Sequence, residues 1–92
     1  MEENYFIAAG IDSKNNVYWI QNTDPVMWSD DKSKAKRYEN ISNAEFDIYM
    51  NQDTIRLIFD SSSMSTVEIY EIEAETEYII QKIVVLRKGV NY

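Results

Sequence analysis

The stretch TVEIYEIEAETEYIIQKIVVLRKG, residues 66–89, decides the fold of this chain. As a helix it would carry acids near its start, basic residues near its end and a glycine at the C-cap, which the helix dipole favours. Its β-branched residues favour strands instead. They are Val67, Ile69, Ile72, Ile79, Ile80, Ile83, Val84 and Val85. We therefore predict strands over 66–74 and 78–86, with one long helix as the alternative.

Three further strands are predicted upstream of this stretch. Residues 5–9 and 17–21 are apolar, β-branched or aromatic, and the turn-forming residues 12–16 lie between them, so the two segments indicate a hairpin. Residues 54–59 alternate in polarity and predict a strand that precedes residues 66–74. After the first hairpin, Asp24-Pro25 interrupts the pattern.

Two short helices are predicted in the middle of the chain. Ser29 is a suitable N-cap, and Asp30 and Asp31 would lie at the positive end of the dipole of a helix over 30–38. A second helix over 43–51 is predicted more strongly. Its signals are a capping box formed by Ser42 and Glu45 and a hydrophobic staple formed by Ile41 and Phe46.

The resulting order, ββααβββ, is an α+β fold in which a small antiparallel sheet packs on two short helices. The 92 residues, 1–92, correspond to a single α+β domain. The start of the chain does not resemble a signal peptide, and no apolar run approaches the roughly 20 residues of a membrane span. We therefore expect a soluble protein in the cytoplasm.

Composition excludes several kinds of chemistry. The chain has no Cys and no His, which removes disulfides, thiolate ligands and imidazole bases. The carboxylates lack calcium-loop spacing and show no acid pair in an apolar setting, so we expect no metal, no cofactor and no enzyme activity. The net charge of -7 disfavours direct contact with nucleic acid or an anionic membrane and favours a basic protein partner.

Four glutamates at alternate positions form the main functional feature: Glu71, Glu73, Glu75 and Glu77. On a strand over 70–78 they would all face solvent, while the residues between them would cover a core. Alternate strand residues are about 6.6–6.8 Å apart, close to the axial spacing of every second DNA phosphate at about 6.8 Å. This row therefore predicts a match to a phosphate-binding surface. The simpler interpretation is a solvated edge strand, and on a helix the row would not exist.

Several short motifs resemble a pattern of small bacteriophage-encoded proteins of unknown function. They are WSDD (28–31), AKRY (35–38), S-x-A-E (42–45) and VEI (67–69), within a resemblance that covers residues 5–72. The resemblance implies phage origin and a small protein directed at the host. The resemblance implies no shared activity. By analogy of size, charge and origin alone, the chain is comparable to several small acidic phage proteins that inhibit bacterial defence enzymes, including anti-CRISPR and anti-restriction proteins, some of which occupy the nucleic-acid groove of their target.

The leading hypothesis is therefore a non-enzymatic DNA mimic that binds a basic, nucleic-acid-handling protein of the host, with a CRISPR nuclease complex as the concrete example. The expected partner-binding residues are Glu71, Glu73, Glu75 and Glu77, helped by Asp30 and Asp31.

Two other hypotheses use other residues. Arg37, Tyr38 and Trp28 could line a pocket that sequesters a nucleotide signal. The basic residues of 32–37 could instead pair with the acidic strand of a second copy, which would make the chain a homodimeric accessory protein. Ordinary surface charge and half-buried core aromatics are the simpler interpretations of these two features.

Overall fold

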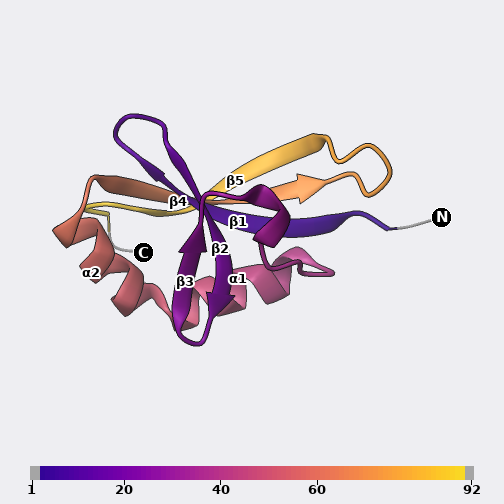
Figure 1. The fold of residues 1–92 in the computed structure, drawn as a ribbon. Helices are drawn as coiled ribbons and strands as arrows, with labels where there is room; N and C mark the ends of the chain where they lie inside the picture. The colour runs from indigo at the N-terminus through magenta and orange to yellow at the C-terminus, as the bar shows by residue number, and fades with distance from the viewer. Residues whose placement is uncertain (1–2, 91–92) are drawn as a thin grey trace.

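A five-stranded antiparallel sheet organises residues 3–90, the part of the chain that the computed structural model describes. The strands and helices are β1 (Tyr5–Asp12), β2 (Val17–Thr23), β3 (Val26–Ser29), a 3-10 turn η1 (Lys32–Lys34), α1 (Ile41–Met50), α2 (Gln52–Ser61), β4 (Met64–Ile72) and β5 (Ile79–Arg87). The strand order is β3-β2-β1-β4-β5, with both helices on one side of the sheet (Figure 1).

β1 is the central strand because its residues are apolar on both faces. It pairs with β2 through Ala9 and Trp19, and with β4 along its whole length, from Tyr5 opposite Ile72 to Asp12 opposite Met64. Two hairpins extend the sheet to β3 on one side and to β5 on the other. β3 and β5 are therefore the edge strands.

One sheet face packs on the helices. Ala8, Ile20, Val67 and Ile69 are buried there against Ala44 and Ile48 of α1 and Ile55 and Phe59 of α2. The spacing of four residues within each helix places each pair on one face, which explains why both short helices lie on the sheet.

The opposite sheet face, called here the open face, is covered by side chains and a loop. Ile7, Ala9, Tyr70 and Ile72 are buried on it together with Ala35, from the segment after η1. The Trp19 and Tyr70 rings pack against each other with their centroids 5.4 Å apart. β1 and β4 are thus buried on both faces, while β5 is covered much less.

The α+β class and the antiparallel sheet agree with the sequence prediction, and β4 and β5 are two strands rather than one long helix. The structure also has five strands and two helices, but not all of them lie where the sequence predicted. The predicted order ββααβββ is wrong, because the structure has three strands before the helices and two after them. The third strand is β3, which precedes the helices, and its four residues directly follow the Asp24-Pro25 turn. Pro25 therefore does not end the hairpin pattern but lies in the turn of a second hairpin, between β2 and β3.

The strand predicted over 54–59 is wrong, because this segment belongs to α2. Its apolar residues fit two periods. Ile55, Leu57 and Phe59 suggest alternation, but the structure buries Ile55 and Phe59 and leaves Leu57 exposed. The helical spacing of four therefore decides the segment.

The helix predicted over 30–38 is also wrong. Only η1 forms, capped by Asp31, whose side chain accepts a hydrogen bond from the Ser33 amide, and Ala35 is already extended. Tyr38 exchanges two backbone hydrogen bonds with Phe6, and the Lys36 amide donates to the Ile20 carbonyl. Pairing with the strands therefore replaces helical hydrogen bonds in this segment.

The helix predicted over 43–51 forms as α1, but the residues that cap its start differ from the predicted ones. Its N-cap is Asn40, whose side chain accepts a hydrogen bond from the Asn43 amide. The capping box predicted for Ser42 and Glu45 therefore does not form, because Ser42 lies inside the helix. Phe46 is 63% exposed, which leaves no hydrophobic staple with Ile41. Within residues 3–90, neither helix has the length and apolar character needed to span a membrane.

Candidate functional site

The β4–β5 hairpin interrupts the predicted glutamate row. β4 ends at Ile72, residues 74–76 turn, and β5 begins at Ile79. The turn is closed by the Glu77 amide, which donates to the Glu73 carbonyl at 2.7 Å, and by the Glu73 amide, which donates to Tyr78 at 2.9 Å. Glu77 adopts a φ of 60°, a left-handed conformation that non-glycine residues seldom take.

The four glutamates consequently do not form a regular comb on one strand face, and that prediction is wrong. Glu71 lies opposite Phe6 and Gln81 in the sheet and accepts hydrogen bonds from Gln81 at 2.8 Å and from Asn4 at 3.1 Å. Glu75 is exposed in the turn, and Glu77 lies beside Arg37 over the open face. What the structure retains is a cluster of carboxylates around one turn, which we call the acidic hairpin (residues 71–77).

The two aspartates of the prediction lie just after β3. The Asp31 carboxylate accepts hydrogen bonds from the Ser33 hydroxyl at 2.7 Å and the Ser33 amide at 2.9 Å, and these bonds hold the pKa of Asp31 below its ordinary value. Asp30 is exposed. Lys32, the next residue after Asp31, reaches the Glu77 carbonyl at 3.4 Å and so links this turn to the acidic hairpin.

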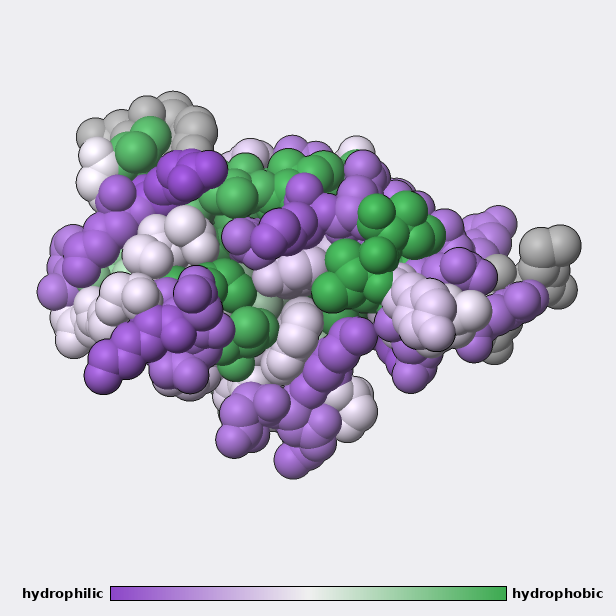
Figure 2. Space-filling model, turned by 90° about the horizontal axis from the view of Figure 1, so that it is seen from above, coloured by the Kyte–Doolittle hydropathy of each residue, from purple (hydrophilic) through white to green (hydrophobic). Residues whose placement is uncertain are grey.

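Large apolar side chains continue directly from the acidic hairpin into β5. Tyr78 is 72% exposed, Ile79 50% and Ile80 51%, and Ile83 is exposed further along. Seen from the side opposite the helices, apolar residues gather on the surface between polar ones (Figure 2). Exposed apolar side chains on a long edge strand are typical of an interaction surface. We call Tyr78, Ile79, Ile80 and Ile83 the apolar strip.

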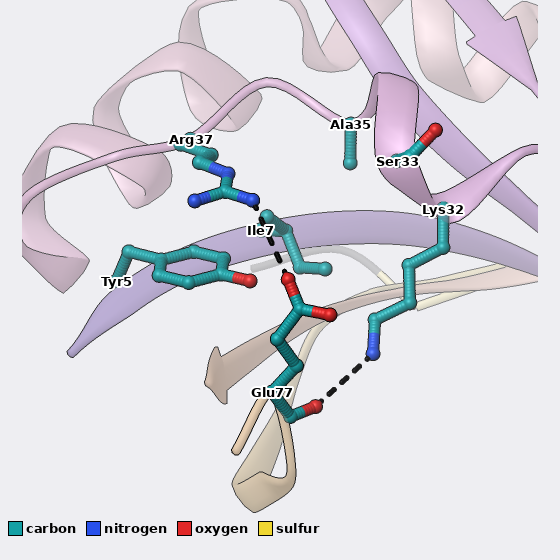
Figure 3. A pocket seen from close by; sticks show the side chains of 7 residues that line it. All are labelled: Tyr5, Ile7, Lys32, Ser33, Ala35, Arg37 and Glu77. Carbon is teal, nitrogen blue, oxygen red and sulfur yellow. Dashed lines mark hydrogen bonds and ion pairs between the residues drawn. The ribbon is translucent and has the colours of Figure 1, made fainter. Parts of the chain in front are cut away.

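A small pocket lies between the acidic hairpin and the segment around η1 (Figure 3). Its volume is about 250 Å³. Tyr5, Ile7, Lys32, Ser33, Ala35, Arg37 and Glu77 line it. The Arg37 guanidinium lies over the Tyr5 ring, 4.1 Å from the centroid, and 3.8 Å from the Glu77 carboxylate. The pocket therefore combines two cations, one carboxylate and an aromatic ring.

The pocket suggested by the sequence, lined by Arg37, Tyr38 and Trp28, does not form. Arg37 lies over the open face, whereas Tyr38 and Trp28 belong to the core beneath the helices. The chain is extended at this point, so neighbouring side chains point to opposite faces. Trp28 instead lines a separate hollow with Tyr18 and Met64, and its buried Nε1 has no hydrogen-bond partner among residues 3–90.

The basic cluster of 32–37 is divided in the same way. Lys36 contacts Asp47 of α1 at 2.8 Å, on the helix side, while Lys32 and Arg37 contact Glu77 across the open face. The pocket residues escaped the sequence interpretation because Lys32 and Glu77 are 45 positions apart. No local pattern signals such a contact.

The functional features thus define a small α+β protein with an acidic hairpin, an adjoining apolar strip and a cationic pocket. Comparisons with protein-family models, curated proteins and solved structures give no match for the chain. In residues 3–90, no three His, Cys, Asp or Glu side chains are grouped so that they could hold a metal ion.

Proposed function

We propose that this chain is a phage-type, anti-CRISPR-like inhibitor that binds a basic, nucleic-acid-handling surface of a host defence protein. The acidic hairpin and the apolar strip form the contact, and binding excludes nucleic acid by steric and electrostatic competition without chemistry. The observation that carries the proposal is the adjacency of exposed Glu75 and Glu77 to Tyr78, Ile79 and Ile80.

Solubility alone accounts for the carboxylates but not for the isoleucines. A surface that serves only solubility has no reason to expose Tyr78, Ile79 and Ile80 together on a strand edge, because such residues promote aggregation. Protein interfaces, in contrast, combine an apolar centre enriched in aromatic residues with a polar rim. In this arrangement the glutamates select a basic partner and the apolar strip provides the buried area.

The regular spacing of a phosphate row is not required by this proposal. Glu71 is bound to Gln81 and Asn4, and Glu77 is close to Arg37, so these two are partly engaged within the chain. Glu73 and Glu75, for which no such ion pair is found within residues 3–90, are the better candidates for the partner. Asp30 remains an exposed auxiliary carboxylate, whereas Asp31 has a structural role in η1.

The test is an affinity capture from a nuclease-treated bacterial lysate, followed by competition of the captured protein with its nucleic acid. The variant Glu73→Lys/Glu75→Lys should lose capture, and the loss should be greatest at low salt because the contact is electrostatic. The control Glu45→Lys/Asp60→Lys makes the same change in charge on the helices and should bind like the wild type.

Two outcomes would contradict the proposal. One is capture and inhibition that survive the hairpin charge reversal at low salt, and the other is a captured partner that nucleic acid does not displace. The variant Ile80→Ser should also weaken capture, but with little dependence on salt, because it removes apolar contact rather than charge.

A further inference from the structure

The cationic pocket contains an arginine that is positioned before any ligand arrives. Arg37 is held by the Tyr5 ring at 4.1 Å, yet its side chain is 58% exposed. Its carboxylate neighbour, Glu77, is 3.8 Å away, longer than a charge-assisted hydrogen bond of about 2.7–2.9 Å. The guanidinium group is therefore oriented by the ring, and its N–H donors form no short hydrogen bond with the Glu77 carboxylate. An arginine in this state suits bidentate binding of an oxyanion.

The second cation faces the same space. Among residues 3–90, Lys32 Nζ bonds the Glu77 backbone carbonyl, at 3.4 Å, and forms no ion pair with the carboxylate of that residue. Figure 3 shows the Arg37 and Lys32 side chains extending toward Glu77 from opposite sides of the pocket. The other nearby acid, Asp31, is already engaged by Ser33. Both cations are thus available to one anionic group placed between them.

Glu77 occupies this position from a strained backbone. Its φ of 60° turns its side chain over the open face, where the carboxylate projects into the pocket. Strained residues concentrate at functional sites, where the surrounding structure enforces them. An exposed ion pair at this distance contributes little free energy, so an incoming anion can displace the carboxylate easily.

We propose that the pocket binds the oxyanion group of a small ligand between Arg37 and Lys32, and that the Glu77 carboxylate occupies the place of this group when the ligand is absent. The pocket has a volume of about 250 Å³. This space suits a phosphate or a short dicarboxylate. Ile7 and Ala35 provide an apolar floor beneath the anionic group.

The proposal is independent of the protein partner proposed above, because it concerns the free chain and a small molecule. It is tested by titrating the intact protein with inorganic phosphate and, separately, with malonate, at constant ionic strength. Binding is followed by amide chemical shifts at residues 5, 33, 35 and 37. Phosphate and malonate distinguish a phosphate ligand from a carboxylate ligand.

Three variants sharpen the experiment. Glu77→Gln removes the internal competitor and should tighten binding by about 1.4-fold to fivefold, the range of an exposed ion pair. Arg37→Gln should abolish the shifts, and Arg87→Gln, on the far end of β5, changes the net charge equally and should leave them unchanged. Circular dichroism confirms that each variant is folded.

The proposal fails if neither anion shifts the pocket amides at millimolar concentration in either the wild type or Glu77→Gln. It also fails if Arg37→Gln and Arg87→Gln weaken binding equally, because the effect would then come from net charge rather than from the pocket. Neither result would affect capture of a protein partner by Glu73 and Glu75, so the two proposals stand or fall separately.

Discussion

The Tyr38 hydroxyl donates a 2.8 Å hydrogen bond to Asp47 Oδ2, and this bond joins the extended segment after η1 to α1. The same oxygen contacts Lys36 Nζ at 2.8 Å and accepts from the Thr23 hydroxyl at 3.0 Å. One carboxylate thus connects β2, the segment 36–38 and α1. Segment 36–38 is therefore held on the sheet by this carboxylate and not by helical hydrogen bonds of the kind that the sequence predicted over 30–38.

Truncation of Asp47 should be costly for this reason. Asp47→Ala leaves the buried Tyr38 hydroxyl without its acceptor, and we expect the free energy of unfolding to fall by about 2–3 kcal/mol. Tyr38→Phe removes the donor and the bond together and should cost about 1 kcal/mol. Urea denaturation provides the measurement, and Asp60→Ala, an exposed aspartate of α2, is the control. Equal costs for Asp47→Ala and Asp60→Ala would show that the network is not structural.

Asp47 should also make the stability depend on pH. Burial raises the pKa of Asp47, but hydrogen bonds from Lys36, Tyr38 and Thr23, with the charge of Lys36, outweigh it, so the pKa lies below the ordinary 3.8. A depressed pKa gives stability that is present above the unfolded value and is lost as the pH falls through the folded value.

The matching measurement compares the wild type with Asp47→Asn from neutral pH to about pH 3. The difference in the free energy of unfolding between the two proteins should be largest near neutrality and should shrink as the carboxylate is protonated. Other acids affect both proteins alike and cancel in this difference. A difference that stays constant with pH would mean that the charge of Asp47 contributes nothing to stability.

The helix caps give a second pair of variants. Asn40 accepts from the Asn43 amide at 2.9 Å, so Asn40→Ala should lower the free energy of unfolding by about 1 kcal/mol. Ser42 lies inside α1 and is exposed, so Ser42→Ala should change it by less than about 0.5 kcal/mol. Thermal unfolding of the two variants checks this ranking. The reverse ranking would restore the capping box that the sequence suggested.

The elements with distinctive local chemistry, β4, β5 and the turn over 12–16, can be predicted from the sequence. The β-branched residues of 66–88 identified β4 and β5, and the turn over 12–16 forms with Asn15 at a φ of 66°, a conformation that Asn tolerates. Asp12 holds that turn through the Lys14 and Asn16 amides, both at 2.9 Å. These features depend on residues near one another in the chain.

Elements whose conformation is determined by tertiary contacts cannot be predicted in this way. Residues 54–59 fit two periods, and only packing against the sheet selects the helix. The turn of the acidic hairpin contains no Gly, Pro or Asn, and Glu77 takes the left-handed position without any sequence signal. The glutamate row is unusual as a sequence pattern, but its geometry depends on a turn that the residue types do not reveal. The contacts of Arg37 with Tyr5 and Glu77 are long-range and equally hidden.

The left-handed position of Glu77 leads to the last prediction. A non-glycine residue in this conformation costs roughly 1–2 kcal/mol, which glycine avoids. Glycine also costs about 0.5–1 kcal/mol through the entropy of the unfolded chain. The exposed pair with Arg37 at 3.8 Å contributes little. We therefore expect Glu77→Gly to raise the free energy of unfolding by about 0.75 kcal/mol, within a range of about 0–1.5 kcal/mol.

Glu75→Gly is the matched control, because Glu75 lies in the same turn without a positive φ. It carries the same entropic cost and relieves no strain, so it should lower the free energy of unfolding by about 0.5–1 kcal/mol. The difference between the two variants in urea denaturation cancels the unfolded-state term and measures the strain stored at Glu77. If the two glycine variants were equally stable, Glu77 would be unstrained, and the turn itself would not be what holds its carboxylate in the pocket.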